Sequence, residues 1–392
     1  MIAKAWSSVR ASLFPSYSYL ADKGSVETYR DRKRLWWLAS VFYPLFPVYA
    51  IGLYLLIGQE WALAVPIVLS YLGVPALDYW LGEDLSNPPE ETVQELEGDR
   101  YYRVLTWITV PLHYLALIVS VVFATQAELS TVGWIIIALT AGLAGGFAVN
   151  TAHEMGHKRD PIDQWFARFA LAVPFYGHFS IEHNFGHHKH VATPEDPASA
   201  KMGESIYRFA MREIPGTFAR AWQIERQRLA RRGHPMWNWR NEILQSYVIS
   251  LLLQGSLVVM LGWGALAFLV VHNVFAWFQL TSANYIEHYG LLRQKRPDGG
   301  YERCQPHHSW NSNHLCSNLL LFHLERHSDH HANPQRRYQS LRDFEDVPRL
   351  PSGYFGMYLL AYIPPLWFKV MDPKLLALPH VAGDLGRLNR LK

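Results

Sequence analysis

Six long apolar runs constrain the fold of this chain more than any other feature of its 392 residues. A helix needs about 20 mostly apolar residues to cross the hydrocarbon core of a bilayer. The runs cover residues 35–58, 61–81, 105–125, 132–151, 246–261 and 264–282, and the fifth is the shortest. Very short breaks (GQE, QAELS and the GWG region) separate the two members of each consecutive pair. The pattern predicts an all-α integral membrane protein with six transmembrane helices in three hairpins.

Lysine and arginine residues predict how these helices are oriented. They gather before residue 35 and in the segments 153–245 and 284–392, which six spans place on one side of the membrane. That side should be the cytoplasm, because loops rich in Lys and Arg are retained there. We expect one membrane-embedded catalytic domain over residues 1–392. Its N- and C-termini and a helical cap (153–245 and 284–392) would be cytoplasmic. Two shorter apolar stretches, 165–179 and 354–370, should be interfacial or buried helices.

Composition excludes several classes of protein. A net charge of +3 is too small to indicate nucleic-acid binding. The two cysteines, Cys304 and Cys316, are too few for a disulfide framework and have no CxxC spacing. No GxGxxG motif follows a strand, so the chain carries no sign of its own nicotinamide or flavin site.

Histidines form three clusters, HEMGH at 153–157, HNFGHH at 183–188 and HSDHH at 327–331, and NYIEHYG adds one more. Neutral imidazole is the commonest side-chain ligand of metal ions. The membrane topology was predicted from apolar runs and basic residues without reference to the histidines. It places all these clusters on one side of the membrane. Nine histidines exceed the coordination positions of one six-coordinate ion. Two such ions can accommodate them and still leave positions open for oxygen, water or substrate. The expected metal ligands are His153, His157, His183, His187, His188, His288, His327, His330 and His331.

Spacing suggests how the clustered side chains point. His153 and His157 are four residues apart, so on a helix they share one face. The same rule predicts that His183 and His187 share a face, with His188 turned about 100° away. Ligating histidines commonly donate their other N–H to a carboxylate. The expected carboxylate partners beside the clusters are Glu154, Glu182, Glu287 and Asp329.

Two other classes of function use similar signals. HEMGH also matches the HExxH signature of zinc metalloproteases, in which the glutamate is the general base. Such a site needs one ion and three protein ligands, which leaves six clustered histidines without a role. A metal transporter without redox chemistry would need polar residues deep in the spans, and few are present. Ligand type alone does not choose between iron, zinc, copper and nickel.

The longer motifs carry a resemblance to a known family. HEMGHK, EHNFGHHKHVATPEDPASA, NYIEHYGLLR and HLERHSDHHANPQRRYQSLR resemble the membrane-bound alkane 1-monooxygenases, within the histidine-box superfamily of membrane desaturases and hydroxylases. The resemblance runs from about residue 61 to 351 and includes LGEDLSNPPEE at 81–91. It implies two non-haem iron ions held by the nine histidines. It further implies O2-dependent hydroxylation of the terminal methyl of medium-chain linear alkanes to 1-alkanols, in the bacterial cytoplasmic (inner) membrane. A fatty-acyl desaturase or another histidine-box hydroxylase is the alternative.

The resemblance also implies partners. Electrons would come from a rubredoxin, itself reduced by a rubredoxin reductase, and this sequence contains no rubredoxin-like cysteine pairs. We expect an acidic donor to dock on the Arg-rich segment 208–240 or at Arg336 and Arg337. The alkane would enter from the bilayer into an apolar and aromatic pocket. Candidate pocket residues, just before NYIEHYG, are Trp277, Phe278 and Leu280.

Overall fold

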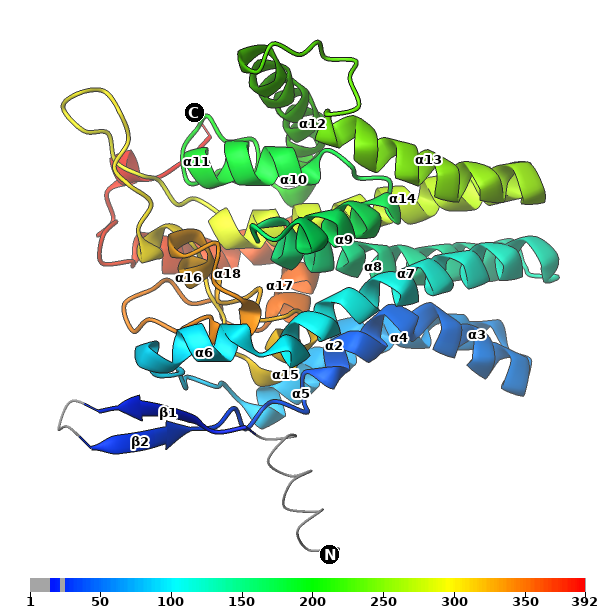
Figure 1. Ribbon diagram of the computed structural model, residues 1–392, viewed down its shortest axis with the longest axis horizontal. Helices are drawn as coiled ribbons and strands as arrows, with labels where there is room; N and C mark the ends of the chain where they lie inside the picture. Colours follow the sequence, from blue (N-terminus) through cyan, green and yellow to red (C-terminus); the bar gives the residue numbers. More distant parts are fainter. Residues whose placement is uncertain (1–14, 22–24, 392) are drawn as a thin grey trace, which may run out of the picture.

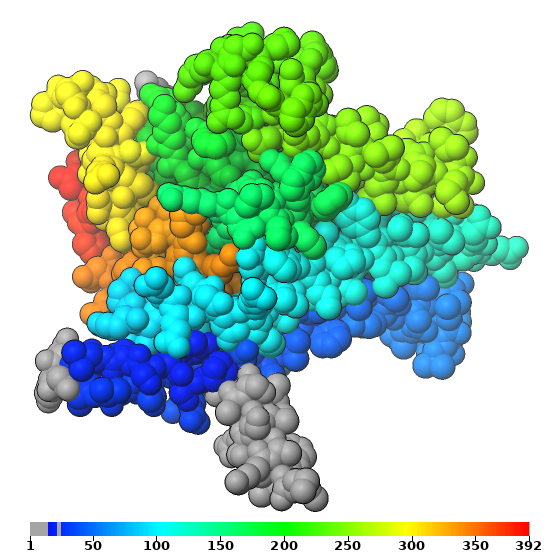
Figure 2. Space-filling model, viewed as in Figure 1, coloured from blue at the N-terminus to red at the C-terminus, as the bar shows by residue number. Residues whose placement is uncertain are grey.

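Six helical stretches long and apolar enough to cross a membrane form one bundle (Figure 1). The structure is a computed structural model that describes residues 15–21 and 25–391, so the expected side of the N-terminus lies outside the described residues. The stretches are Leu38–Ile57, Glu60–Leu81, Arg100–Gln126, Thr131–Gly156, Glu242–Leu261 and Trp263–His288. They match the six expected runs, and the prediction of an all-α fold with six spans is confirmed. The tips of the three hairpins protrude together at the right of Figure 2.

The first two spans are segmented and the last four are continuous. The first consists of α2 (Leu38–Phe42), η1 (Tyr43–Leu45) and α3 (Phe46–Ile57). The second consists of η2 (Glu60–Ala64), α4 (Val65–Val68), the π-helical η3 (Leu69–Gly73) and α5 (Val74–Leu81). Prolines at the starts of η1, α3, α4 and α5 explain these joints, because proline lacks the N–H that continues a helix. The continuous spans are α7 (Arg100–Gln126), α8 (Thr131–Gly156), α13 (Glu242–Leu261) and α14 (Trp263–His288).

Helices α8 and α14 extend beyond the apolar runs that predicted them. The runs end at residues 151 and 282, whereas the helices continue to Gly156 and His288. A drop in hydropathy marks where a helix leaves an apolar environment, but the backbone hydrogen bonds continue past that point. The first residues of the expected cap segments, 153–156 and 284–288, therefore continue the helices of two spans. His153 and His288 belong to the last turns of two spanning helices.

Close packing of α8 against α14 fixes these two helix ends relative to each other. A Cβ atom on Gly142 would lie 2.8 Å from the backbone oxygen of His272, and one on Gly146 would lie 2.6 Å from Cβ of Gln279. Small residues of this kind let transmembrane helices approach closely. The histidines at the ends of α8 and α14 are thus carried on one rigid pair of helices.

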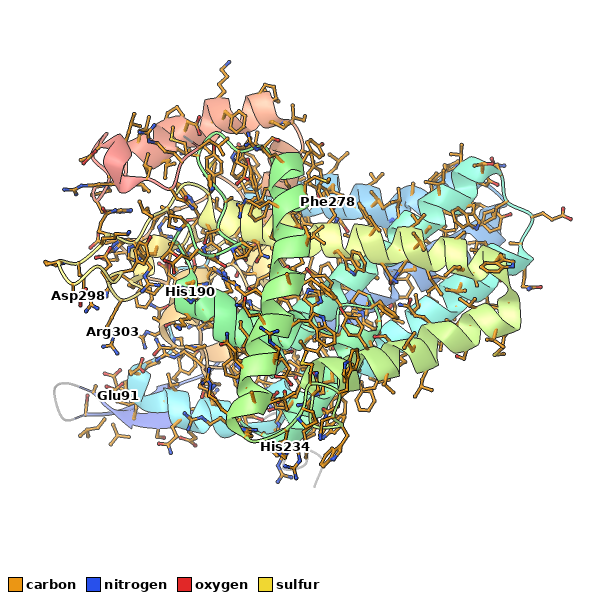
Figure 3. The ribbon with its side chains drawn as sticks, turned by 90° about the horizontal axis from the view of Figure 1, so that it is seen from above. Glu91, His190, His234, Phe278, Asp298 and Arg303 are labelled. Atoms are coloured by element: carbon orange, nitrogen blue, oxygen red, sulfur yellow. The ribbon has the colours of Figure 1, made fainter. Side chains whose placement is uncertain are left out.

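The described part of the chain outside the six spans contains one antiparallel hairpin, β1 (Tyr17–Leu20) and β2 (Val26–Tyr29), and several helices. Its α-helices are α6 (Val93–Gly98), α9 (Pro161–Ala172), α10 (Phe179–Glu182), α11 (His188–His190), α12 (Ile206–Arg231), α15 (Leu315–Leu320), α16 (His327–Ala332), α17 (Tyr354–Ala361) and α18 (Pro364–Leu376). A π-helix, η5 (His183–His187), joins α10 to α11, and short 3-10 helices cover Glu90–Thr92 (η4), Pro306–His308 (η6), Tyr338–Ser340 (η7) and Leu385–Arg387 (η8). Helix α12 crosses over α14 when the bundle is viewed from above (Figure 3). Among the described residues, neither 165–179 nor 354–370 adds a span.

The largest apolar core joins the end of α14 to the C-terminal helices. Tyr285 of α14 and Tyr289, which directly follows that helix, pack on the buried Trp367 of α18, with ring centroids 5.0 and 5.2 Å from it. Tyr354 and Phe355 of α17 belong to the same core. This packing anchors the C-terminal segment against the helix that ends in His288.

Candidate metal centre

All nine expected ligand histidines come together, in two adjacent groups. The five-histidine group consists of His153, His157, His183, His188 and His330. The four-histidine group consists of His187, His288, His327 and His331. Within each group, every residue offers one ring nitrogen that lies within 4.8 Å of the others. Two cap segments, 183–188 and 327–331, and the ends of two spanning helices therefore build one site.

The cluster at 183–188 divides between the two groups because its backbone is π-helical. In η5 the N–H of His188 donates to the carbonyl of His183, five residues earlier. This wider turn brings Nε2 of His183 and Nε2 of His188 to 3.1 Å, while His187 joins the other group. The rings of His183 and His187 are stacked with centroids 5.1 Å apart, as α-helical spacing predicts, but they belong to different groups.

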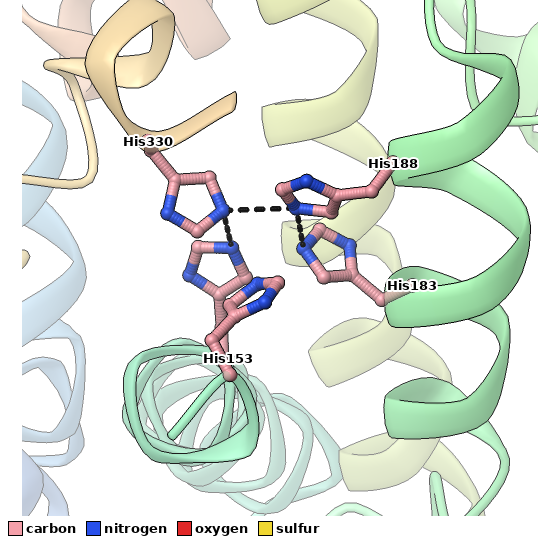
Figure 4. A group of neighbouring side chains, drawn as sticks. His153, His183, His188 and His330 are labelled. Carbon is pink, nitrogen blue, oxygen red and sulfur yellow. Dashed lines mark hydrogen bonds between the residues drawn. The ribbon is translucent and has the colours of Figure 1, made fainter. Parts of the chain in front are cut away.

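Helix α16 divides its histidines in the same way. His327 and His331, one helical turn apart, bring their Nε2 atoms to 3.0 Å in the four-histidine group. His330 faces the other way, with its Nε2 2.9 Å from Nε2 of His153 and 3.1 Å from that of His188 (Figure 4). The rings of His188 and His331 have centroids only 4.4 Å apart, so the two groups lie side by side.

The nitrogen spacing fits bound metal ions. Histidine nitrogens lie about 2.0–2.1 Å from a metal such as zinc, so two ligands at a right angle are about 2.9 Å apart. Nε2 of His188 lies 3.1 Å from two other ring nitrogens. One ring N–H cannot form a good hydrogen bond to both of them, whereas one bound cation can be coordinated by all three nitrogens. Nε2 of His157 and Nε2 of His187 are buried with no hydrogen-bond partner among the described residues. The residues present therefore suit a metal centre.

Burial keeps most of these imidazoles in the form that binds metal. Loss of hydration lowers the pKa of the cap histidines, and their mutual repulsion lowers it further. This applies to His157, His183, His188, His327, His330 and His331. A neutral ring leaves one nitrogen free as a ligand.

His187 has a different environment, because its outer nitrogen meets a buried carboxylate. Nδ1 of His187 lies 2.9 Å from Oδ2 of Asp196, which also accepts a hydrogen bond of 2.7 Å from the Ser199 hydroxyl. Burial lowers the pKa of His187, but the Asp196 carboxylate outweighs burial and raises that pKa. Hydrogen bonding of this kind fixes the tautomer and leaves Nε2 for the metal. Sequence reasoning did not choose Asp196 as a partner, although it lies within the PEDPASA stretch.

We predict that Asp196→Asn weakens metal binding at the four-histidine group about 10- to 100-fold, the usual effect of removing such a partner. Asparagine keeps the shape but loses the charge that orients His187. Competition with a chelator would measure the affinity. Asp298→Asn, at an exposed ion pair with Arg296, is the matched control. Unchanged affinity in Asp196→Asn would show that the carboxylate does not support this ligand.

The expected partners Glu154 and Asp329 contact basic residues of the cap. Glu154 lies 3.1 Å from Nζ of Lys158 and accepts the backbone N–H of Tyr338. Asp329 lies 3.1 Å from Nη1 of Arg336. Both carboxylates neighbour a ligand histidine in sequence and tie its helix to the cap.

Glu182 and Asp196 share one guanidinium. Arg220 of α12 donates to Oε1 of Glu182 from Nε at 2.8 Å and to Oδ1 of Asp196 from Nη2 at 2.7 Å. The Arg220 side chain is only 15% exposed, and both carboxylates are buried. Buried charges need such pairing to be tolerated. Arg220 therefore holds the carboxylate that contacts His187, and sequence spacing gave no sign of this contact.

Glu287 faces the metal side of the site. Its Oε2 lies 3.4 Å from Nε2 of His327, the same nitrogen that approaches the other histidines of that group. It precedes His288 at the end of α14 and is buried. This position suits a carboxylate that would lie beside the bound ions. It does not suit one that accepts a hydrogen bond from the outer nitrogen of a ligand histidine.

A cavity opens onto both histidine groups. It is lined by Gly146, Phe147, Asn150, His153, Phe179, His183, Gln279, Leu280, Ala283, Asn284, Glu287, Leu321, Leu324, His327, Phe355 and Tyr358. The expected pocket residue Leu280 is among them. Trp277 instead donates its indole N–H to the carbonyl of Pro174, and Phe278 stacks on Tyr362. The aromatic residues that line the cavity come from α8, α10 and α17, which are too far apart in sequence for spacing to group them.

A third group, Glu302, His307 and His308, lies apart from the nine histidines. The backbone N–H of Gln305 donates to Nδ1 of His308 at 2.9 Å, so the ring proton lies on Nε2. That nitrogen is 3.2 Å from Oε1 of Glu302. Nε2 of His308 nevertheless makes no hydrogen bond among the described residues.

Six spans and two histidine groups at one end of the bundle define an integral membrane protein of the histidine-box type. The family model described as fatty acid desaturase matches residues 130–363, which contain all nine histidines. Alkane 1-monooxygenase 1 of Alcanivorax borkumensis is 52% identical over 364 residues, 92% of this chain and 89% of that protein. The chain therefore belongs to the alkane 1-monooxygenase family of membrane oxidoreductases.

Further relatives show how far the similarity extends. Alkane 1-monooxygenase of Pseudomonas putida is 52% identical over 366 residues, 93% of this chain and 90% of that protein. The hydroxylase component of a xylene/toluene monooxygenase of Pseudomonas putida is 33% identical over 242 residues, 60% of this chain and 62% of that protein. Similarity to these proteins favours oxygenation over the zinc protease suggested by HEMGH. Consistent with this, His153 and His157 belong to a group of five histidines rather than to a three-ligand site.

Proposed function

We propose that this protein hydroxylates the terminal methyl group of medium-chain linear alkanes to give 1-alkanols, with O2 as oxidant. The nine histidines would hold two non-haem iron ions, which when bound supply the binding and reduction of O2. The observation that carries this proposal is a cavity that opens onto both histidine groups and is otherwise largely apolar. The names of the relatives that span most of the chain support the substrate class.

The chain's own contribution is to position an alkane that has no polar handle. Such a substrate can be held only by the length and shape of an apolar pocket. Phe147, Leu280 and Phe355 form part of the apolar wall, whereas His153 and His327 are at the side of the cavity that faces the metal centre. A chain lying along the apolar wall would present its terminal carbon to that side.

The reaction also needs electrons. The balance is R–CH3 + O2 + 2e⁻ + 2H⁺ → R–CH2OH + H2O, so each turnover consumes two electrons and two protons. We infer that a rubredoxin, reduced by a rubredoxin reductase, delivers the electrons from the cytoplasm. The basic segments expected on the cap side support a cytoplasmic cap and a location in the bacterial inner membrane.

A basic hollow in the cap is our proposed docking surface for the donor. It is lined in part by Lys189, Arg220, Arg228, Arg231 and Arg232. Because Arg220 also contacts Asp196, the hollow lies over the side of the site that holds His187. The alternative surface is less suitable. The side chains of Arg336 and Arg337 are only 12% and 14% exposed, and both are engaged by acidic residues.

We predict that Arg231→Glu combined with Arg232→Glu slows association with reduced rubredoxin about tenfold or more at low ionic strength, with a smaller effect at high salt. Both residues are exposed and neither touches a ligand histidine. Stopped-flow oxidation of the donor would measure the rate. Arg296→Glu, another exposed cap residue, should leave the rate nearly unchanged. Equal slowing in both variants would argue against this hollow.

Product analysis tests the proposed function. Purified protein loaded with iron, given octane, ¹⁸O2 and reduced rubredoxin, should form 1-octanol carrying one ¹⁸O atom, detected by gas chromatography and mass spectrometry. Internal alcohols alone, or the absence of any alcohol with iron fully bound, would contradict terminal hydroxylation. An unsaturated product from an acyl substrate in place of the alcohol would favour the desaturase alternative.

A further inference from the structure

One buried carboxyl group close to the metal centre has no cation beside it. Glu213 of α12 is 1% exposed. Its hydrogen-bond donors are neutral: the Thr281 hydroxyl at 2.8 Å and the Asn284 amide at 3.1 Å. Among the described residues, no ion pair reaches Glu213. The neighbouring Arg212 turns instead to Glu204.

Three other buried carboxylates of the cap differ in this respect. On the same helix, Glu225 is buried and pairs with Arg228 at 2.6 Å. Glu182 and Asp196 share Arg220. An isolated buried carboxylate is costly, so a carboxyl group without a cation retains its proton. Burial accordingly raises the pKa of Glu213 to about 7.

Glu213 faces a second, smaller cavity. This cavity is polar for a buried space, because Tyr176, His178 and Thr217 also line it. Tyr176 Oη and Nε2 of His178 are buried without a hydrogen-bond partner among the described residues. Unpaired polar atoms around a buried space suit the passage of a hydrated proton.

The small cavity adjoins the cavity at the metal centre. Four residues line both spaces: Phe179, His183, Leu280 and Asn284. Asn284 is the link that matters here, because its amide donates to Glu213 while its side chain borders the larger cavity. Glu182 also borders the small cavity and contacts Arg220, which lines the exposed hollow of the cap. Polar groups thus continue from the hollow, past Glu213, to the metal centre.

We propose that Glu213 stores a proton and supplies it, through the small cavity beside His183, to the cavity at the metal centre. Hydroxylation consumes two protons for each O2 reduced, with two electrons from the external donor, and one oxygen atom leaves as water. The O–H bond of Glu213 breaks as it gives up its proton, and solvent protons arriving from the cap restore it. The inference rests on the proposed function, since protons are consumed only when O2 is reduced.

The protonation of Glu213 predicts a pH dependence. A carboxylic acid that must carry a proton is active below its pKa and loses activity above it, so turnover should fall as pH rises through about 7. The contacts from α14, Thr281 and Asn284, do not titrate in this range. The titratable groups that face Glu213 from the other packed elements are Tyr176, His178, Glu182, His183 and Asp196.

Infrared spectroscopy and turnover together test the proposal. Glu213→Gln keeps the side-chain size but carries no transferable acid proton. In metal-free protein at pH 6, the difference spectrum between wild type and this variant should contain the carbonyl band of one neutral carboxylic acid. That band should disappear with a midpoint near pH 7. With both ions bound, alcohol formation should fall about 100-fold, within the usual range for loss of a positioned acid. Glu225→Gln should remove no such band, because Glu225 is ion-paired.

The controls separate proton supply from a purely structural role. Thr281→Val removes one hydrogen bond to Glu213 but leaves the acid, so alcohol formation should stay within about threefold of wild type. If Glu213→Gln fails to bind metal, Glu213→Asp replaces it, and a shifted alkaline limit of turnover supports the proposal. No missing band, full turnover in Glu213→Gln, or an unshifted limit in Glu213→Asp overturns it. Because the infrared result needs neither metal nor alkane, it stands apart from a failure of alkane hydroxylation itself.

Discussion

Replacing His187 with alanine should release the metal ion of the four-histidine group and reduce alcohol formation by at least about 1,000-fold. The magnitude follows from the loss of both a ligand and the charged Asp196 contact behind it, since disturbing the outer partner alone costs about 10- to 100-fold. His183→Ala should instead affect the five-histidine group, although it lies only four residues away. Mass spectrometric metal analysis of purified variants, with turnover of octane, would measure both effects.

His190→Ala is the matched control for these two variants. His190 follows the same cluster, but its ring is partly exposed and lies 3.2 Å from Glu195 rather than among the ligands. It should retain wild-type metal content and activity. Full activity in His187→Ala would refute its assignment as a ligand. Identical metal loss at the same ion in His183→Ala and His187→Ala would contradict the division of the cluster between two groups.

Replacing Arg220 with methionine should have the second largest effect. Methionine keeps the length of the side chain but leaves Glu182 and Asp196 buried without their shared cation. Removing one member of a buried ion pair commonly costs about 3–5 kcal/mol. We expect a lower midpoint of thermal unfolding in detergent, together with loss of metal from the four-histidine group, because Asp196 no longer holds His187 in place.

Arg226→Met provides the comparison for Arg220→Met. Arg226 lies on the same helix α12 but is exposed, so its replacement should change neither stability nor metal content appreciably. Equal unfolding midpoints and metal contents for the two variants would show that the contacts of Arg220 are dispensable.

The sequence was sufficient to predict the six spans and the gathering of the nine histidines. Run lengths set by bilayer thickness depend only on local composition, and the six spans follow directly from them. The positions of the helix ends did not follow, since α8 and α14 continue into polar sequence to carry His153 and His288. Hydropathy reports the surroundings of a helix rather than its hydrogen bonds.

The internal geometry of the site was harder to predict from the sequence. The division of the 183–188 cluster between the two groups depends on one π-helical turn. Residue spacing does not distinguish a π-helical turn from an α-helical one. The contacts of Arg220 with Glu182 and Asp196 join residues 38 and 24 positions apart in the chain. Such pairs depend on how α12 crosses the bundle, which local patterns do not specify.

The iron content of the purified wild-type protein tests the central claim of a two-metal centre most directly. Mass spectrometric metal analysis, combined with protein quantification by amino acid analysis, gives the number of ions per chain in preparations that form 1-octanol. Two histidine groups with five and four ligands predict two iron ions per chain. One ion per chain in fully active protein would contradict the account.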